Sequence, residues 1–336
     1  MPSSCPTATT LSSSKQEGVN LMFRICFFAV AAAFCCVMFS GCGQAEQKTK
    51  IGISIPAADH GWTGGVVYWA NQAKKAIEAE NPGYEVVVST ARDAAEQVDK
   101  VENLLVQGIK ALVILPHEPG PLTAVCEQAA KQDVQLVVVD RGLTKDIADV
   151  TVSGDNPGFG RAGAQAVAQA LNGKGKIVVM EGIPCVVNSD RVNAFKAEIA
   201  KYPEIEILDS QSANWDTEKG MRLMENFLQK YPKIDGVWTG DDDVLLGALK
   251  AYEESKRTDV RCFVGGAGSK QIVKMVLDGH KLVRFDVTYP PKMIEVGARQ
   301  ALALLKGEKP AAKQIVPAEI IDQKNAKNFY YPDSVF

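Results

Sequence analysis

Short apolar runs alternate with longer amphipathic segments along most of this chain. In the first half the apolar runs are Ile51–Ile55, Tyr84–Ser89, Ala111–Leu115 and Leu136–Asp140. The segments between them place apolar residues three or four positions apart, which is the period of a helix. Because the runs are apolar throughout, they are typical of parallel strands that are covered on both faces. The pattern predicts strand–helix–strand units wound in a right-handed sense into an α/β sheet.

The second half of the chain repeats this alternation. About ten strands are many for one open twisted sheet, so two lobes are favoured over a single sheet. A cluster of turn-forming residues from Ser153 to Gly158 marks the break between them. The strands expected here are Lys176–Met180, Glu206–Ser210, Gly236–Gly240, Cys262–Gly266 and Leu282–Val287, and the helices are Asn188–Lys201, Thr217–Tyr231, Leu245–Glu254 and Pro291–Leu305.

The N-terminal region has the pattern of a targeting segment. Arg24 precedes an uncharged apolar stretch of about fifteen residues, whereas a membrane-spanning helix needs about twenty. The stretch ends in Gly41-Cys42, which resembles the lipobox of bacterial lipoproteins, although Phe39 stands where Leu is usual. We expect a signal peptide over residues 1–41 and a lipid anchor on Cys42. A plain cleaved signal, a short membrane anchor and a start at Met22 remain open.

Charge and cysteine content narrow the class of protein. The formal net charge of −3 gives no basic surface for nucleic acid, so none is expected as a partner. Of the eight cysteines, three lie beyond the expected lipid site Cys42: Cys126, Cys185 and Cys262. Their number and wide spacing form neither a disulfide framework nor a metal cluster, and buried thiols are expected.

Polar and aromatic residues follow the predicted strands. Ligands of open α/β sheets bind beyond the carboxyl ends of the strands. Carboxylates and amides there can accept or donate hydrogen bonds to sugar hydroxyls, an arginine donates a fixed fork, and a tryptophan face covers C–H groups. The alternative is that these residues are solvated loops. The candidate ligand-binding residues are Asp59, His60, Trp62, Asp140, Arg141, Asn188, Arg191, Trp215, Asp241 and Thr288.

From Lys50 to about Asp322 the chain resembles the type I periplasmic sugar-binding proteins of ABC transporters, the ribose- and galactose-binding group. The resemblance rests on motifs that stand in the family order. They are the aromatic loop after the first strand, Asp140-Arg141, Ser153-Gly-Asp-Asn, Gly182…Asp190-Arg191…Phe195 and Gly240-Asp241-Asp242…Leu246-Gly247-Ala248.

The resemblance implies roles for individual residues. His60, Trp62 and Thr63 match the sugar-contacting loop of the ribose-type proteins, and Asp140-Arg141 matches their Asp-Arg pair. Trp215 matches the aromatic residue of the second lobe, Asp241 an amide and Thr288 the hinge glutamine, while a family arginine aligns within Asn188 to Arg191. Ala267 stands where the family has a ligand carboxylate. With Asp59, Asp241 and Asp286 adding acid, the ligand is expected to be a sugar, an amino sugar or a polyol.

The same resemblance implies an organisation and partners. We expect two doubly wound parallel-sheet lobes of an α/β protein, joined by a hinge of three crossings near Ser153, Thr288 and Pro310. The expected partners are ABC permease and ATPase subunits, for a monomer held at the cell envelope by its lipid. The boundaries expected are 1–41 for the signal peptide, 42–50 for a tether, 51–153 plus 289–311 for the first lobe, and 154–288 plus 312–336 for the second.

Other functions fit the sequence less well. Gly158-Phe-Gly160-Arg-Ala-Gly163 matches a dinucleotide-binding fingerprint, but it follows a long polar turn, so we interpret it as a helix start rich in small residues. Asp241-Asp242-Asp243 is interpreted as one ligand carboxylate, one helix-start charge and one solvated residue, not a metal site. No catalytic residue, cofactor or metal is expected. A sensor that presents its solute to a chemoreceptor or histidine kinase and, less favoured, an exported NAD-dependent oxidoreductase remain alternatives.

Overall fold

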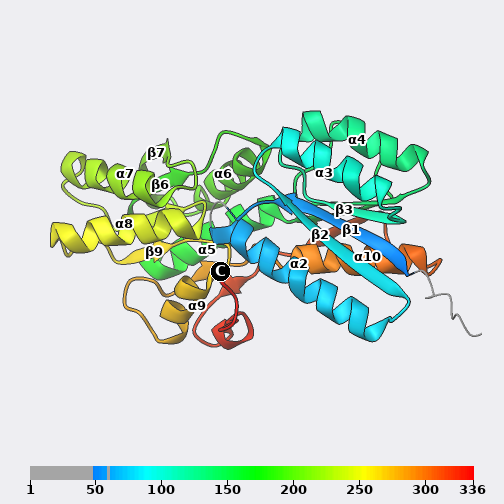
Figure 1. Cartoon of the computed structure of the whole chain (residues 1–336). Coiled ribbons are helices and arrows are strands. Elements are labelled where there is room, and N and C mark those ends of the chain that lie inside the picture. The colour runs from blue at the N-terminus through cyan, green and yellow to red at the C-terminus, as the bar shows by residue number, and fades with distance from the viewer. Residues whose placement is uncertain (1–47, 59–60) are drawn as a thin grey trace, which may run out of the picture. The chain divides into compact units, whose positions relative to one another are not determined.

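Six parallel strands form the sheet of the first lobe. The computed structural model (Figure 1) describes residues 48–58 and 61–336. The sheet has the order β11-β5-β4-β3-β1-β2. Every neighbouring pair of these strands is parallel, as the apolar runs predict. The strands are β1 (Thr49–Pro56), β2 (Tyr84–Ala91), β3 (Ala111–Ile114), β4 (Gln135–Val139), β5 (Val150–Gly154) and β11 (Lys313–Val316).

Helices cover both faces of this sheet. Val113 and Val137 belong to the apolar cluster shared with α2 and α10, while their neighbours Leu112 and Leu136 belong to the cluster shared with α3 and α4. Successive side chains of a strand point to opposite faces, so two covered faces require runs that are apolar at every position. The helices are α2 (Gly61–Glu80), α3 (Ala94–Val106), α4 (Pro119–Lys131) and α10 (Met293–Leu305).

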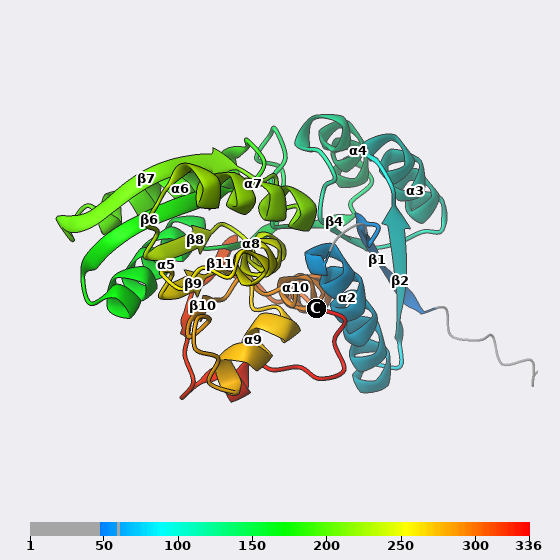
Figure 2. The same ribbon diagram turned by 90° about the vertical axis from the view of Figure 1, so that its left-hand side faces the viewer.

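The second lobe contains a four-stranded parallel sheet in the order β7-β6-β8-β9. Figure 2 shows this lobe after a turn of 90° from the view of Figure 1. Helices α5 and α6 pack together, as do α7 and α8. A short antiparallel pair, β10 with β12, stands beside this sheet. The elements are β6 (Lys174–Glu181), β7 (Glu204–Ser212), β8 (Gly236–Thr239), β9 (Cys262–Val264), β10 (Asp286–Val287), β12 (Ile320–Ile321), α5 (Asn156–Leu171), α6 (Val186–Ile199), α7 (Thr217–Lys230), α8 (Asp242–Ser255), α9 (Lys270–Leu277) and the 3-10 helix η1 (Ala326–Asn328).

The third crossing lies later in the chain than the sequence suggested. Strand β11 pairs with β5 in the first sheet, so its residues do not belong with the second lobe, where the range 312–336 had placed them. The chain therefore crosses between Val316 and Ile320, not near Pro310. The sequence has no continuous apolar run at β11, because every other side chain of this edge strand is exposed.

Glycines at the start of α5 allow close packing in the second lobe. A Cβ on Gly160 would lie 2.0 Å from the carbonyl oxygen of Arg191, and one on Gly163 would lie 2.3 Å from Nε1 of Trp238. The glycines of the dinucleotide-like motif thus bring α5 against α6 and β8. Among the helices that the structure describes, none is long and apolar enough to cross a membrane.

Candidate functional site

A tyrosine on the second crossing connects groups from both lobes. Tyr289 follows β10, and its hydroxyl donates to Oδ1 of Asp140 at 2.5 Å. Asp140 follows β4 in the first lobe and has a left-handed backbone with φ of 60°, in which its N–H is bonded to the carbonyl of Val152. Burial, and then the charge of Asp140, raise the pKa of Tyr289, so the phenol stays protonated and acts as the donor.

Arg191 connects Tyr289 to groups of the second lobe, and these residues with Asp140 form a network. It is buried on α6, its Nε donates to Oδ1 of Asn156 at 2.9 Å, and its Nη1 donates to the carbonyl of Gly240 at 2.8 Å. Its guanidinium carbon lies 4.2 Å from the ring centroids of both Phe159 and Tyr289. This cation–π stacking on two rings fixes the plane of the guanidinium.

Two tryptophans predicted from the sequence lie at the ends of this network. The buried indole of Trp62, at the start of α2, donates to the carbonyl of Tyr289 at 2.9 Å. Trp215, after β7, lies 5.8 Å from the guanidinium of Arg191, and its buried Nε1 has no hydrogen-bond partner. A Cβ on Gly182 would lie 2.0 Å from that Nε1, so only glycine leaves room for the indole.

The three consecutive aspartates lie at the start of α8. Asp241 is buried and caps α8, its Oδ1 accepting from the N–H of Asp243 at 2.7 Å. Burial, and then the charges of Asp243 and Asp242, raise its pKa well above the usual value. Asp242, the first residue of α8, is fully buried and accepts from the N–H groups of Gly266 and Ser269, so its carboxyl group connects α8 to the loop after β9.

Two other predicted residues are held in local structure. Asn188 is buried, and its Oδ1 accepts from the N–H of Gly182 at 2.7 Å, which closes the loop before α6. Arg141 donates to the carbonyl of His117 at 2.9 Å, and its Nε lies 4.0 Å from Oδ2 of Asp140, so it stands beside the network. The predicted residues Asp59, His60 and Cys42 lie outside the described residues.

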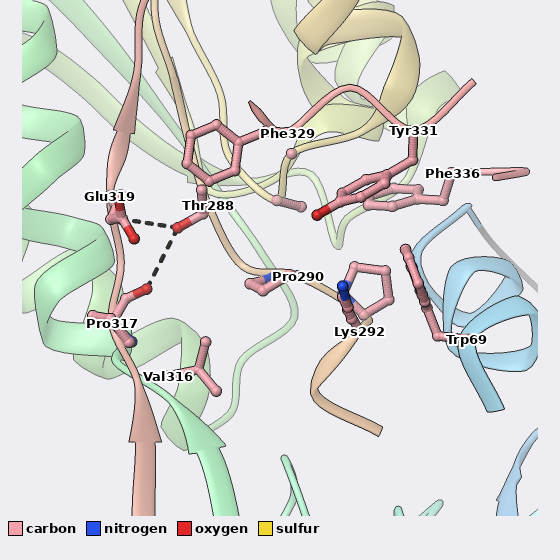
Figure 3. Close-up of a pocket in the computed structure, with 13 residues that line it drawn as sticks. Trp69, Thr288, Pro290, Lys292, Val316, Pro317, Glu319, Phe329, Tyr331 and Phe336 are labelled. Carbon is pink, nitrogen blue, oxygen red and sulfur yellow. Dashed lines mark hydrogen bonds between the residues drawn. The ribbon is translucent and has the colours of Figure 1, made fainter. Parts of the chain in front are cut away.

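Thr288 faces away from this network, against the expectation for the hinge position. Its hydroxyl accepts from the N–H of Glu319 at 2.9 Å and lies 3.5 Å from the carbonyl of Pro317 (Figure 3). It lines a cavity of about 160 Å³ that Trp69 and Tyr331 also border. Thr288 therefore joins the second and third crossings, and its neighbour Tyr289 occupies the site.

Sequence reasoning missed three members of the network: Tyr289, Asn156 and Phe159. Asn156 and Phe159 lie in the segment that was interpreted as a turn and helix start. Asp155 caps that helix, and Asn156 at its first position reaches Arg191. Polar residues next to a predicted crossing were the signal that could have found Asn156.

Thiols and metal ligands do not add to the site. Cys126 and Cys262 are buried as expected, and burial raises the pKa of each thiol to about 12. Cys185 is exposed, so the expectation of buried thiols was wrong for it. Within residues 48–58 and 61–336, no cluster of three metal-ligating side chains occurs.

The network has the chemistry of a carbohydrate site. It combines the carboxylate of Asp140, the guanidinium of Arg191 and the indole N–H of Trp215, which has no hydrogen-bond partner among the described residues. Hydroxyl groups of a polyol can both donate and accept, so they can bond to each of these groups, and the aromatic faces suit C–H surfaces.

Comparison with known proteins agrees with this chemistry. Residues 51–309 match the family model of the periplasmic binding protein domain. The ribose import binding protein of Bacillus subtilis is 29% identical over 256 residues, which cover 75% of this chain and 82% of that protein. The D-apiose import binding protein of Paraburkholderia graminis is 27% identical over 302 residues, 88% of this chain and 94% of that protein. An ABC transporter solute-binding protein of Bacillus halodurans, solved with bound myo-inositol, superposes with a TM-score of 0.73 at 25% identity over 86% of this chain and 99% of that one.

Proposed function

Because this chain belongs to the family of periplasmic binding proteins, we propose that it captures a sugar or a polyol and delivers it to an ABC importer. The observation that carries the proposal is the network of Asp140, Tyr289 and Arg191, which joins side chains from both lobes at the carboxyl ends of their strands. Relatives named for ribose and apiose import, and one with bound myo-inositol, support a ligand rich in hydroxyl groups. The role of the protein is binding, and no catalytic step is required.

Capture follows from the way the groups are divided between the lobes. Asp140 and Trp62 come from the first lobe, and Arg191 and Trp215 come from the second. A solute that bonds to both sets stabilises the arrangement in which the lobes are together, which is the principle of hinge closure. A solute lacking one hydroxyl leaves a buried donor or acceptor unpaired, at a cost of about 1–3 kcal/mol, and is rejected.

A thermal-shift screen of residues 42–336 tests the class of ligand. The panel contains pentoses, hexoses, amino sugars and polyols, each at about a hundred times the dissociation constant expected of a binding protein. At that ratio the folded state gains about 2.7 kcal/mol, which raises the melting temperature by several degrees. Stabilisation by at least one compound supports the proposal. A panel that leaves the melting temperature unchanged throughout contradicts it.

The anchoring at Cys42 is a further part of this proposal. A lipid on its thiol would hold the protein at the cell envelope. The support is the small-residue pair Gly41-Cys42 after an apolar stretch. Metabolic labelling with palmitate should mark the full chain and not the Cys42→Ser variant. Equal labelling of both would exclude Cys42 as the lipid site.

A further inference from the structure

Tyr289 contacts residues of the candidate site through both its backbone and its side chain. Its carbonyl accepts from Trp62, its hydroxyl donates to Asp140, and the same hydroxyl lies 3.4 Å from Nδ2 of Asn156. Trp62 and Asp140 come from the first lobe, and Asn156 follows the first crossing. Tyr289 itself is on the second crossing, so it lies where the two lobes meet.

The ring of Tyr289 is packed against other residues on several sides. On one side, a Cβ on Gly154 would lie 2.1 Å from its Cε2, so the end of β5 is in direct contact with the ring. On another side the guanidinium of Arg191 lies 4.2 Å from the ring centroid, and Phe159 meets the ring edge-on at 6.3 Å. Packing on these sides keeps the phenol oxygen in place beside Asp140.

Asp140 depends on this hydroxyl for its orientation. Its backbone is fixed by the bond to Val152, and among the residues that the structure describes its carboxylate accepts a close hydrogen bond from Tyr289, at Oδ1. The other oxygen, Oδ2, is 4.0 Å from Arg141, beyond hydrogen-bond distance. With Oδ1 held, Oδ2 and the neighbouring guanidinium of Arg141 are left to meet a ligand hydroxyl.

We propose that Tyr289 is a positioning residue for solute binding, which aims Asp140 of the first lobe and Arg191 of the second at the same ligand. The inference rests on the proposed function, since it needs a solute at this site. The second crossing thereby contributes to selectivity, because the ligand hydroxyl that faces Asp140 is recognised only when the phenol of Tyr289 is bonded to Oδ1 of Asp140.

Tyr289→Phe tests this role, because it removes the hydroxyl and keeps the ring over Arg191. We expect its affinity for the best-bound solute, measured by calorimetry, to fall at least about tenfold, as for loss of a hydrogen bond to a charged group. The matched control is Tyr252→Phe, which removes another buried phenol, one that accepts from the N–H of Val260 at 3.0 Å in the second lobe. The control should bind as the wild type does.

A double-mutant cycle separates positioning from a structural contribution. On an Asp140→Asn background, Tyr289→Phe should reduce affinity by less than threefold, because the carboxylate that it orients is already gone. Full additivity of the two losses, or wild-type affinity in Tyr289→Phe, would overturn the positioning role while leaving the proposed function intact. Absence of binding by the wild type itself to any sugar or polyol would overturn both.

Discussion

Two buried carboxyl groups, Asp242 and Asp286, interact with each other in the second lobe. Both are 0% exposed, and each also accepts from the loop after β9, Asp242 from Ser269 at 2.7 Å and Asp286 from Gly268 at 3.2 Å. Burial raises the pKa of Asp242 to about 6, and burial followed by the charge of Asp242 raises that of Asp286 well above its usual range. The folded protein therefore keeps a proton on this pair that the unfolded chain releases near pH 4.

This proton makes stability depend on pH in a definite direction. The folded state binds more protons than the unfolded state above about pH 4, so the free energy of unfolding should fall as the pH rises from there through about 6 and beyond. Asp286→Asn removes the second acid and keeps a hydrogen-bonding side chain. We expect the melting temperature of this variant to exceed that of the wild type at pH 8 and to approach it at pH 5.

Thermal unfolding at the two pH values provides the measurement. Asp235→Asn is the matched control, since Asp235 is also buried in the second lobe but is paired with Lys233 and Arg261. That variant should be less stable than the wild type at pH 8. A wild-type melting temperature that rises between pH 5 and 8, together with an Asp286→Asn variant that shows no gain, would refute the shared proton.

At the scale of elements, the packing of α5 against β8 leaves no room for a side chain at Gly163. Trp238 is fully buried and stacks on Phe195 with ring centroids 4.1 Å apart, so its indole cannot move away from an added methyl group. Gly163→Ala should lower the free energy of unfolding by about 2 kcal/mol, as in an overpacked core. Urea denaturation measures the change.

Gly120, in α4, is the control for that substitution. A Cβ there would meet nothing within 4 Å, so Gly120→Ala should change the free energy of unfolding by less than about 1 kcal/mol, through helix propensity alone. Equal effects of the two substitutions would mean that helix propensity, and not the contact with Trp238, determines the response of α5.

The strands that are buried on both faces were predicted from the sequence, and two more exposed strands, β5 and β11, were not. Strands β1, β3 and β4 are covered on both faces, so their apolar runs identified them from the sequence. Strand β5 alternates buried and half-buried residues and ends in turn formers, so it was read as the break between lobes. Strand β11 lies at the sheet edge with exposed positions, and β10 is shorter than expected because only Asp286 and Val287 pair with β12.

The site was predicted in its chemistry but not in each residue. Asp140, Trp62, Arg191 and Trp215 were predicted because they come after strands at the carboxyl edge; the structure brings them together, and their contact with a solute stays a prediction. Thr288 was predicted as a ligand residue, but its neighbour Tyr289 is the residue that contacts Asp140. Neighbouring residues of an extended segment point to opposite sides, so an error of one position exchanges them. The capping role of Asp241 depends on where α8 begins, which the pattern placed later in the chain.

At the scale of the whole molecule, side chains from both lobes meet at Tyr289. Trp62 approaches it from the first lobe and Arg191 from the second, so removal of either should disturb the same binding event. Each side chain is buried, and truncation of a buried central tryptophan or arginine typically costs about 2 kcal/mol or more of binding free energy, which is about thirtyfold in affinity.

Calorimetric titration of the wild type, Trp62→Ala and Arg191→Ala with the same sugar or polyol tests this account most directly. Circular dichroism first establishes that both variants are folded. We expect one solute to bind to each wild-type molecule, and each variant to lose at least about thirtyfold in affinity. Wild-type affinity in either folded variant would show that the solute does not bind between Trp62 and Arg191.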